Sequence, residues 1–229
     1  MLLEVIVQTV ADARAAAAGG ADRLEVVRSI HLGGLTPPLS LVHAIQEATP
    51  LPLRVMVRGN AGFETTPGES LELSRAAARF AAAGVDGLVV GFARNGQPDI
   101  DDVARVLEAA DGVNVTFHRA FDNLDTPLDA IEVISTLPQI DRILTSGGEG
   151  TALERSTRLR ALTERAAGRL TIIAGGGVDQ DALLAFVATG CVREAHVGRA
   201  AREGADPTGP VSETLVRALR RIAGDDGRG

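Results

Sequence analysis

Short runs of apolar residues alternate with longer helical stretches along the whole chain. Several of the short runs are β-branched and nearly continuous, as is typical of strands that are buried on both faces. We expect eight strands, at residues 2–7, 22–27, 53–58, 87–91, 113–119, 141–145, 170–174 and 194–197. Each gap between them has room for one helix, for example 9–19, 68–83, 99–110, 151–167, 179–189 and 210–222.

Eight strand–helix units predict a closed (β/α)8 TIM barrel. The chain has 229 residues, a little below the ~250 typical of this fold. An open doubly wound sheet is the alternative, but it would need a Gly-rich G-x-G-x-x-G turn after the first strand, and VQTVADARA contains none. No linker divides the chain, so we expect one TIM-barrel domain over 1–229, with a frayed tail at 224–229.

The composition excludes several kinds of chemistry. The chain has no Trp, no Tyr and one Cys, and all 23 of its basic residues are Arg. A lysine Schiff base, a phosphate-loop lysine, a tyrosine acid, a two-cysteine redox pair and a multi-thiolate zinc site are therefore ruled out. The formal net charge of −7 and the 3% of aromatic residues argue against a nucleic-acid partner.

The same features indicate a location. A lone cysteine, Cys191, fits a reducing cytoplasm, and we expect it to be buried. The opening residues MLLEVIVQTV predict a strand and not a signal peptide. No apolar run approaches the ~20 residues that cross a bilayer, so no membrane partner is expected.

Two carboxylates, Glu4 and Glu25, interrupt otherwise apolar strands that are neighbours in the predicted barrel. A buried carboxylate is costly unless a cation, a metal or several donors compensate it. One interpretation is that each pairs with an arginine such as Arg58 or Arg119. The other is that one of them acts as a general base or metal ligand, with a pKa raised by burial and by the other carboxylate.

Two histidines, His118 and His196, lie at strand ends. With Glu25 they form a carboxylate and imidazole set that a divalent metal would accept, although no local metal-binding spacing is present. His118 is equally suited to acid or base catalysis, beside Glu4 and Glu25. His43, by contrast, falls mid-helix, where we expect it at the surface.

The carboxyl ends of the strands also carry residues that suit an anion. Chemistry in this fold takes place at that end of the barrel, and the loops after the seventh and eighth strands often bind phosphate. The three glycines 175–177 are equally compatible with a plain tight turn. The residues that we expect at a substrate or anion site are Arg58, Arg119, Asp122, Ser146, Gly147, Gly176, Gly177 and Arg199.

Six segments together resemble the CutC copper-homeostasis family, namely GGADRLEVV, GGLTPPL, VTFHRAFDNLDTPLDAI, RILTSGG, IIAGGGV and EAHVG. The resemblance runs from the first strand to the eighth. It implies a cytoplasmic TIM barrel associated with copper tolerance or trafficking. It also implies a polar mouth lined by Glu4, Glu25, Arg58, His118, Arg119, Asp122, Ser146 and His196.

The sequence departs from the family pattern at two places. Family members often carry cysteines beside the first two strand glutamates, whereas these stretches are EVIVQT and EVVRS here. Soft Cu(I) prefers thiolate or thioether ligands, and the chain offers only Cys191, Met1 and Met56, which are scattered. After the third strand, VRGNAGFETTPGE lacks the second Arg and the Asp of the family pattern.

Two functions follow from these observations. The first is a CutC-like protein associated with copper homeostasis, with an anion-binding polar pocket at the barrel mouth; copper itself is implied by the resemblance alone. The alternative is an enzyme, such as an isomerase, epimerase or lyase, that performs acid–base chemistry on a small phosphorylated or carboxylated metabolite. We expect a small-molecule anion as partner, and a homodimer is compatible with the fold.

Overall fold

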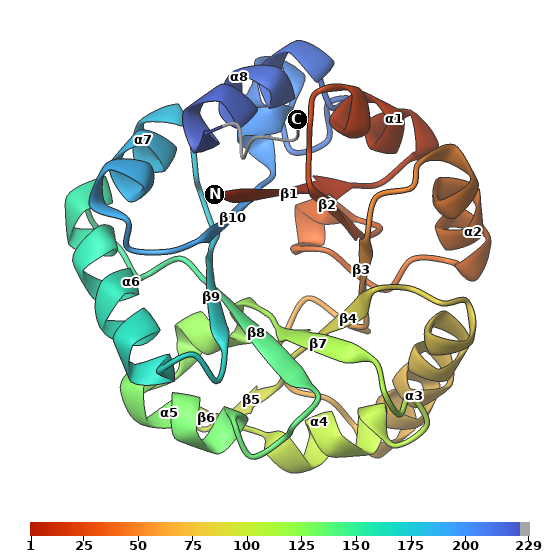
Figure 1. Ribbon diagram of the computed structural model, residues 1–229. Helices are drawn as coiled ribbons and strands as arrows, with labels where there is room; N and C mark the ends of the chain where they lie inside the picture. Colours follow the sequence, from red (N-terminus) through yellow and green to blue (C-terminus); the bar gives the residue numbers. More distant parts are fainter. Residues whose placement is uncertain (225–229) are drawn as a thin grey trace.

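The structure is a computed structural model that describes residues 1–224. Its main sheet is a closed barrel of parallel strands in the order β1-β10-β9-β8-β7-β4-β3-β2, and Figure 1 shows the helices arranged around the outside of this ring. The predicted TIM barrel is therefore confirmed. The closed ring excludes the open doubly wound sheet.

The barrel strands match the eight predicted segments: β1 and β10 have the predicted bounds, β8 begins one residue earlier, and the others are shorter. They are β1 Leu2–Val7, β2 Arg23–Val26, β3 Leu53–Met56, β4 Gly87–Val90, β7 Asn114–Phe117, β8 Ile140–Thr145, β9 Thr171–Ala174 and β10 Glu194–Val197. The third strand ends before Arg58, and the fifth ends before His118 and Arg119. These three residues thus belong to the loops at the barrel mouth.

A helix follows each barrel strand. The helices are α1 Val10–Ala18, α2 Leu39–Ala48, α3 Pro67–Ala82, α4 Ile100–Leu107, α5 Pro127–Ile134, α6 Ala152–Ala166, α7 Gln180–Thr189 and α8 Glu213–Ala223. Side chains fix several of their starts. Thr66 and Glu69 form a capping box at α3, and Thr151 and Glu154 form another at α6. Asp179 accepts a hydrogen bond from the Ala182 N–H at the start of α7.

Several smaller elements were not expected, among them a hairpin and a 3-10 turn. A hairpin of β5 Ala93–Arg94 and β6 Gln97–Pro98 turns at Asn95 and Gly96, both of which have positive φ, as a tight hairpin turn requires. A 3-10 turn, η2 Arg119–Asn123, follows β7. A turn this short has no hydrophobic periodicity from which it could be predicted.

Successive side chains of each strand point alternately toward the helices and into the barrel, so the protein has one core outside the barrel and one inside it. On β1, Leu3, Val5 and Val7 face the helices and join the large hydrophobic core between helices and barrel. A separate, small apolar cluster inside the barrel consists of Ile6, Val27, Met56 and Val89. The remaining interior positions are largely polar or charged, which is unusual, because most TIM barrels fill this space with Val, Ile and Leu.

Four further expectations concern single features. Cys191 is buried after α7, and His43 is exposed on α2, as predicted. Among residues 1–224, no helix has the length and apolar character needed to cross a bilayer. The expected frayed tail, apart from Gly224, lies outside the described residues.

Candidate functional site

The lower half of the barrel is closed by Arg54, whose side chain is almost completely buried. Its guanidinium donates to Asp86 at 2.8 Å and binds both oxygens of Asp141 at 2.9 and 3.0 Å. A Cβ on Gly87, the partner of Arg54 in β4, would lie 2.5 Å from the guanidinium. Glycine at this position therefore lets the arginine cross the barrel.

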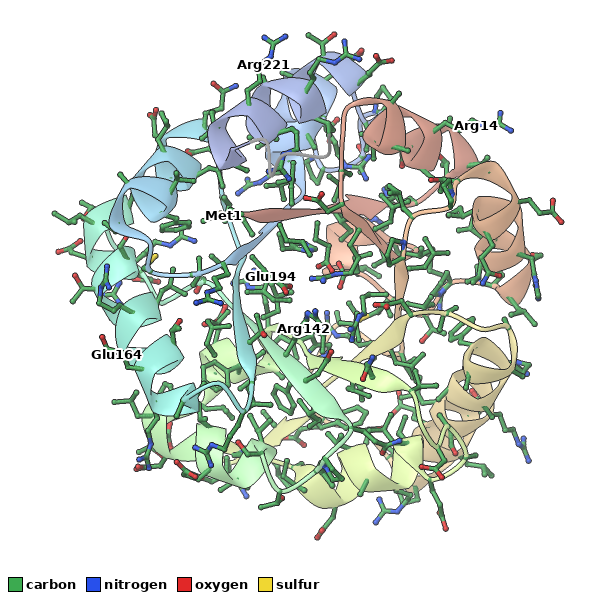
Figure 2. All side chains as sticks on the ribbon, viewed as in Figure 1. Met1, Arg14, Arg142, Glu164, Glu194 and Arg221 are labelled. Carbon is green, nitrogen blue, oxygen red and sulfur yellow. The ribbon has the colours of Figure 1, made fainter. Side chains whose placement is uncertain are left out.

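Arg23 continues the charged interior toward the mouth. Its Nε lies 2.5 Å from Glu4 and its Nη2 lies 2.6 Å from Glu194. Glu194 in turn accepts from Arg142 Nε at 3.0 Å, and Arg142 also pairs with Asp141. Figure 2 shows Arg142 and Glu194 inside the ring of strands. Charges of alternating sign therefore run without a break from Arg54 to Glu4.

His196 connects this series of charged side chains to the barrel mouth. Its Nδ1 lies 2.8 Å from Oε1 of Glu4, and its Nε2 lies 3.6 Å from Oε2 of Glu25. Burial opposes charge on the ring, but the charges of Glu25 and Glu4 and the hydrogen bond with Glu4 raise the pKa of His196 overall. Burial also opposes charge on Glu4, yet Arg23 and His196 hold its pKa well below the usual range.

Glu25 has a different environment, although its side chain is equally buried. No arginine bonds to it, and its Oε1 has no hydrogen-bond partner. Burial raises its pKa to about 7, helped by the charge of Glu4 and opposed by those of His196, Arg23 and Arg58. Glu25 thus titrates near neutral pH, whereas the pKa of Glu4 is lowered.

A cavity of about 570 Å³ opens above Glu25 at the carboxyl ends of the strands. This volume suits a small molecule. Its charged and imidazole lining consists of Glu25, His31, Arg58, His118, Arg119, His196 and Arg199. The cavity is therefore lined by three arginines and one acid, in a protein whose formal net charge is −7.

His118 presents a neutral imidazole to this cavity. Its Nδ1 accepts a hydrogen bond from the Ala120 N–H at 3.1 Å, whereas its Nε2 is buried without a partner. Burial and the charge of Arg58 lower its pKa to about 3. Because Nδ1 is an acceptor, the single proton of the neutral ring lies on Nε2.

The glycine turn after β9 is held from behind by Arg155 of α6. Its guanidinium donates to the carbonyls of Ser146, Gly175, Gly176 and Gly177. The N–H groups of Gly176, Gly177 and Val178 have no acceptor in the described structure. Free N–H groups directly before the N-terminus of α7 are a favourable environment for an anion.

The three arginines of the cavity differ in how many hydrogen bonds they already make with the protein. Arg58 donates to the carbonyls of Gly33, Ala61 and Gly62, and its guanidinium lies 4.6 Å from the centre of the Phe63 ring. Arg119 is half exposed and bonded through Nε to Asp122. The Arg199 side chain is exposed and makes no hydrogen bond or ion pair with any described residue.

Asp122, Ser146 and Gly147 lie beside the mouth cavity and not in it. They line a neighbouring cavity of about 640 Å³ between η2, α5 and α6. Asp122 accepts from Thr145 Oγ1, from the Ser146 N–H and from Arg119, so its carboxylate is fully used by the protein. Its role here is to position Arg119.

The structure thus divides the predicted site residues into three groups. The mouth cavity brings together Glu25, Arg58, His118, Arg119, Gly176, Gly177, His196 and Arg199. Glu4 lies beneath it, and Asp122, Ser146 and Gly147 lie to one side. The interpretation that each strand glutamate pairs with an arginine, such as Arg58 or Arg119, holds for Glu4 alone, and its partner is Arg23. Glu25 pairs with no arginine, and its Oε1 has no partner.

Sequence reasoning missed Arg23, Arg142, Glu194 and Arg155. The first three are charged residues at inward positions of strands, and a charged position in an apolar strand was the signal that singled out Glu4 and Glu25. Arg155 lies in an ordinary amphipathic helix. No pattern in the sequence distinguishes it from the surface arginines of α6.

The donor atoms of the cavity do not fit a copper ion. Met56 supplies the one thioether of the lining, and Cys191 is buried elsewhere, below α7. Both nitrogens of His196 face carboxylates, which leaves Nε2 of His118 as the free nitrogen of the two buried rings. Across residues 1–224, no three His, Cys, Asp or Glu side chains are grouped to hold a metal. The predicted metal set of His118, His196 and Glu25 gains no support from this arrangement.

Fold and site together define a (β/α)8 barrel with a charged interior and a polar mouth. A family model described as the CutC family matches residues 1–201. The chain therefore belongs to the CutC family.

Known relatives agree with this assignment. The chain is 35% identical over 199 residues to a family protein CutC of Histophilus somni, covering 86% of this chain and 82% of that protein. It is 35% identical over 179 residues to the human copper homeostasis protein cutC homolog, covering 77% of this chain and 65% of that protein. The crystal structure of CutC from Streptococcus agalactiae superimposes with a TM-score of 0.77 at 24% identity, covering 86% and 97% of the two chains.

Proposed function

We propose that this CutC-family protein acts in copper homeostasis by binding a small anionic molecule at its barrel mouth, and not by holding Cu(I) on thiolates. The name of the human relative supports a role in copper homeostasis. Anion binding is supported by the charges of the mouth cavity. The proposal that Cu(I) is not held on thiolates rests on the absence of a thiol from the cavity lining.

The observation that carries the anion site is the excess of positive charge in the cavity. Three arginines face one acid, and that acid, Glu25, is half protonated near pH 7. The unbonded N–H groups of Gly176, Gly177 and Val178 add donors without adding charge. A phosphate or carboxylate would find charge-assisted hydrogen bonds from both sources.

Sulfate is a suitable probe, because its charge does not change near neutral pH. We expect calorimetry to show one sulfate site, and Arg199→Ala to weaken it by about tenfold or more, the usual value of one charged hydrogen bond. Arg199 is the best arginine to replace, because its side chain supports no other part of the structure.

Arg14→Ala provides the matched control. Arg14 is exposed on α1, and Figure 2 shows it pointing away from the barrel. This variant should bind sulfate as the wild type does. Equal binding by the wild type and Arg199→Ala would contradict the proposed site, and so would the absence of binding.

Copper provides the second test. In an anaerobic competition titration with a chromogenic chelator, we expect Cu(I) to bind no more tightly than about 1 μM. Cys191→Ser should leave the result unchanged, because Cys191 is buried away from the cavity. A tight 1:1 Cu(I) complex that is lost in Cys191→Ser would refute this part of the proposal.

The predicted homodimer and the cytoplasmic location stay predictions. The names of the relatives do not favour the alternative function, an acid–base enzyme. One observation does favour it, namely that Glu25 and His118, which both line the cavity, each have a buried polar atom without a partner.

A further inference from the structure

We infer that the barrel mouth is an active site for proton transfer at a carbon next to a carbonyl group, with Glu25 as the base and the Nε2–H of His118 as the group that polarises the carbonyl oxygen. The inference rests on the proposed anion site, which would hold the substrate. The substrate class is a small carbonyl compound that carries a phosphate or carboxylate group.

The first argument is the pair of unpaired atoms. Oε1 of Glu25 and Nε2 of His118 are both buried, and neither has a hydrogen-bond partner. Both residues line the same cavity, one from β2 and the other from the end of β7. A buried polar atom without a partner destabilises the folded state. Two such atoms on side chains that line one cavity are therefore best explained by a ligand that pairs with both.

The second argument is that the two atoms have complementary roles. His118 can only donate through Nε2, because the Ala120 N–H already occupies its Nδ1. Glu25 can accept a proton whenever it is ionised, and a pKa of about 7 keeps a useful fraction ionised at neutral pH. One group thus accepts a proton while the other stabilises negative charge.

The third argument is the fixed orientation of Glu25. His196 lies on its Oε2 side at 3.6 Å, and Glu4 holds His196 from behind at 2.8 Å. This arrangement leaves Oε1 as the oxygen that is free to react. His196 and Glu4 are accordingly positioning residues, which act on the reaction through Glu25.

The step balances without any oxidant or reductant. The Glu25 carboxylate removes a proton from the carbon, and the C–H electron pair forms a carbon–carbon double bond. The carbonyl π pair moves to its oxygen, which the Nε2–H of His118 stabilises by a hydrogen bond. The protonated Glu25 then returns a proton to the enolate. Isomerisation and epimerisation reactions both begin with this step.

Deuterium wash-in tests the inference. The wild-type protein is incubated in D2O with dihydroxyacetone phosphate, fructose 6-phosphate or pyruvate, and exchange at the α carbon is followed by proton NMR. We expect exchange in at least one probe, with a rate that rises as the pH increases through about 7 as Glu25 ionises. Binding of each probe is measured in parallel by calorimetry.

Two variants assign the roles. Glu25→Gln should lower the exchange rate by roughly a hundredfold to ten-thousandfold. His118→Phe should lower it by roughly a hundredfold or more, while the pH dependence of the residual rate is kept. Glu164→Gln, an exposed change on α6, is purified in the same way and should exchange as the wild type does. Sulfate binding shows that each variant is folded.

The outcomes separate the two proposals. If a probe binds but none exchanges, proton transfer is refuted and the anion site stands. Exchange that persists in Glu25→Gln also refutes the assignment of the base. If neither sulfate nor any probe binds, the anion site fails and the inference that rests on it fails with it.

Discussion

Replacing Arg23 by Met is expected to lower the free energy of unfolding by about 3–5 kcal/mol, because it leaves buried carboxylates without their partner. Arg23 bonds to Glu4 at 2.5 Å and to Glu194 at 2.6 Å, and all three side chains are buried. Met keeps most of the volume but none of the charge. Urea unfolding at neutral pH measures the effect.

The loss should depend on pH in a defined direction. The pKa of Glu4 is held below its ordinary value of 4.5, so its pairing stabilises the protein above that pH and is lost as the pH falls through the lower folded-state pKa. Without Arg23 this contribution shrinks. The difference between variant and wild type should therefore be largest near neutral pH and narrow in acid.

The control is Arg14→Met, the same change at an exposed position of α1, where we expect a change within about 0.5 kcal/mol. If Arg23→Met lowered the free energy of unfolding no more than Arg14→Met does, the ion pairs of Arg23 would add nothing to stability.

Glu25→Gln is expected to act in the opposite direction and to stabilise the protein in alkaline solution. The folded chain holds a proton on Glu25 up to a pKa of about 7, whereas the unfolded chain loses it near 4.5. The folded state therefore binds more protons between these values, and stability falls as the pH rises through this range. At about 1.4 kcal/mol per pKa unit, the full effect is about 3 kcal/mol.

Glutamine cannot ionise, so its variant should escape this loss. Urea unfolding from about pH 5 to about pH 9 should give curves that are close together in acid and separate by up to about 3 kcal/mol in alkali. The low pKa of His118 is common to both proteins and largely cancels in the difference. Glu164→Gln should show no such pH-dependent gain, and parallel curves for Glu25→Gln would show that burial does not raise the Glu25 pKa.

These two changes separate structural from functional charge. Glu4, Arg23 and Glu194 satisfy one another, so their loss should cost stability. Glu25 lowers stability at neutral pH and above while it lines the cavity. A buried group that lowers stability in this way is characteristic of a functional site.

The sequence predicted the barrel well because its signal is repeated. Eight apolar runs separated by helical stretches permit few other arrangements, and errors of a few residues at strand ends do not change the topology. The hairpin at Asn95 and Gly96 was missed because each of its strands is only two residues long.

The candidate site was predicted less completely, because it depends on pairing across strands. The positions of Glu4 and Glu25 suggested burial, but only the folded structure shows that the His196 ring reaches both carboxylates. Arg58 was expected to clamp a ligand, whereas much of its guanidinium holds loop carbonyls. Which of several arginines remains free depends on loop geometry that no local pattern encodes.

The interior charges also affect how the barrel can be divided. Arg54 of β3 bonds to Asp141 of β8, and Arg23 of β2 bonds to Glu194 of β10. Each pair joins the first four barrel strands to the last four. A half-barrel would expose an unmatched set of guanidinium or carboxylate groups along its open edge. The two halves of this protein are therefore complementary fragments of one cooperative unit and not independent modules.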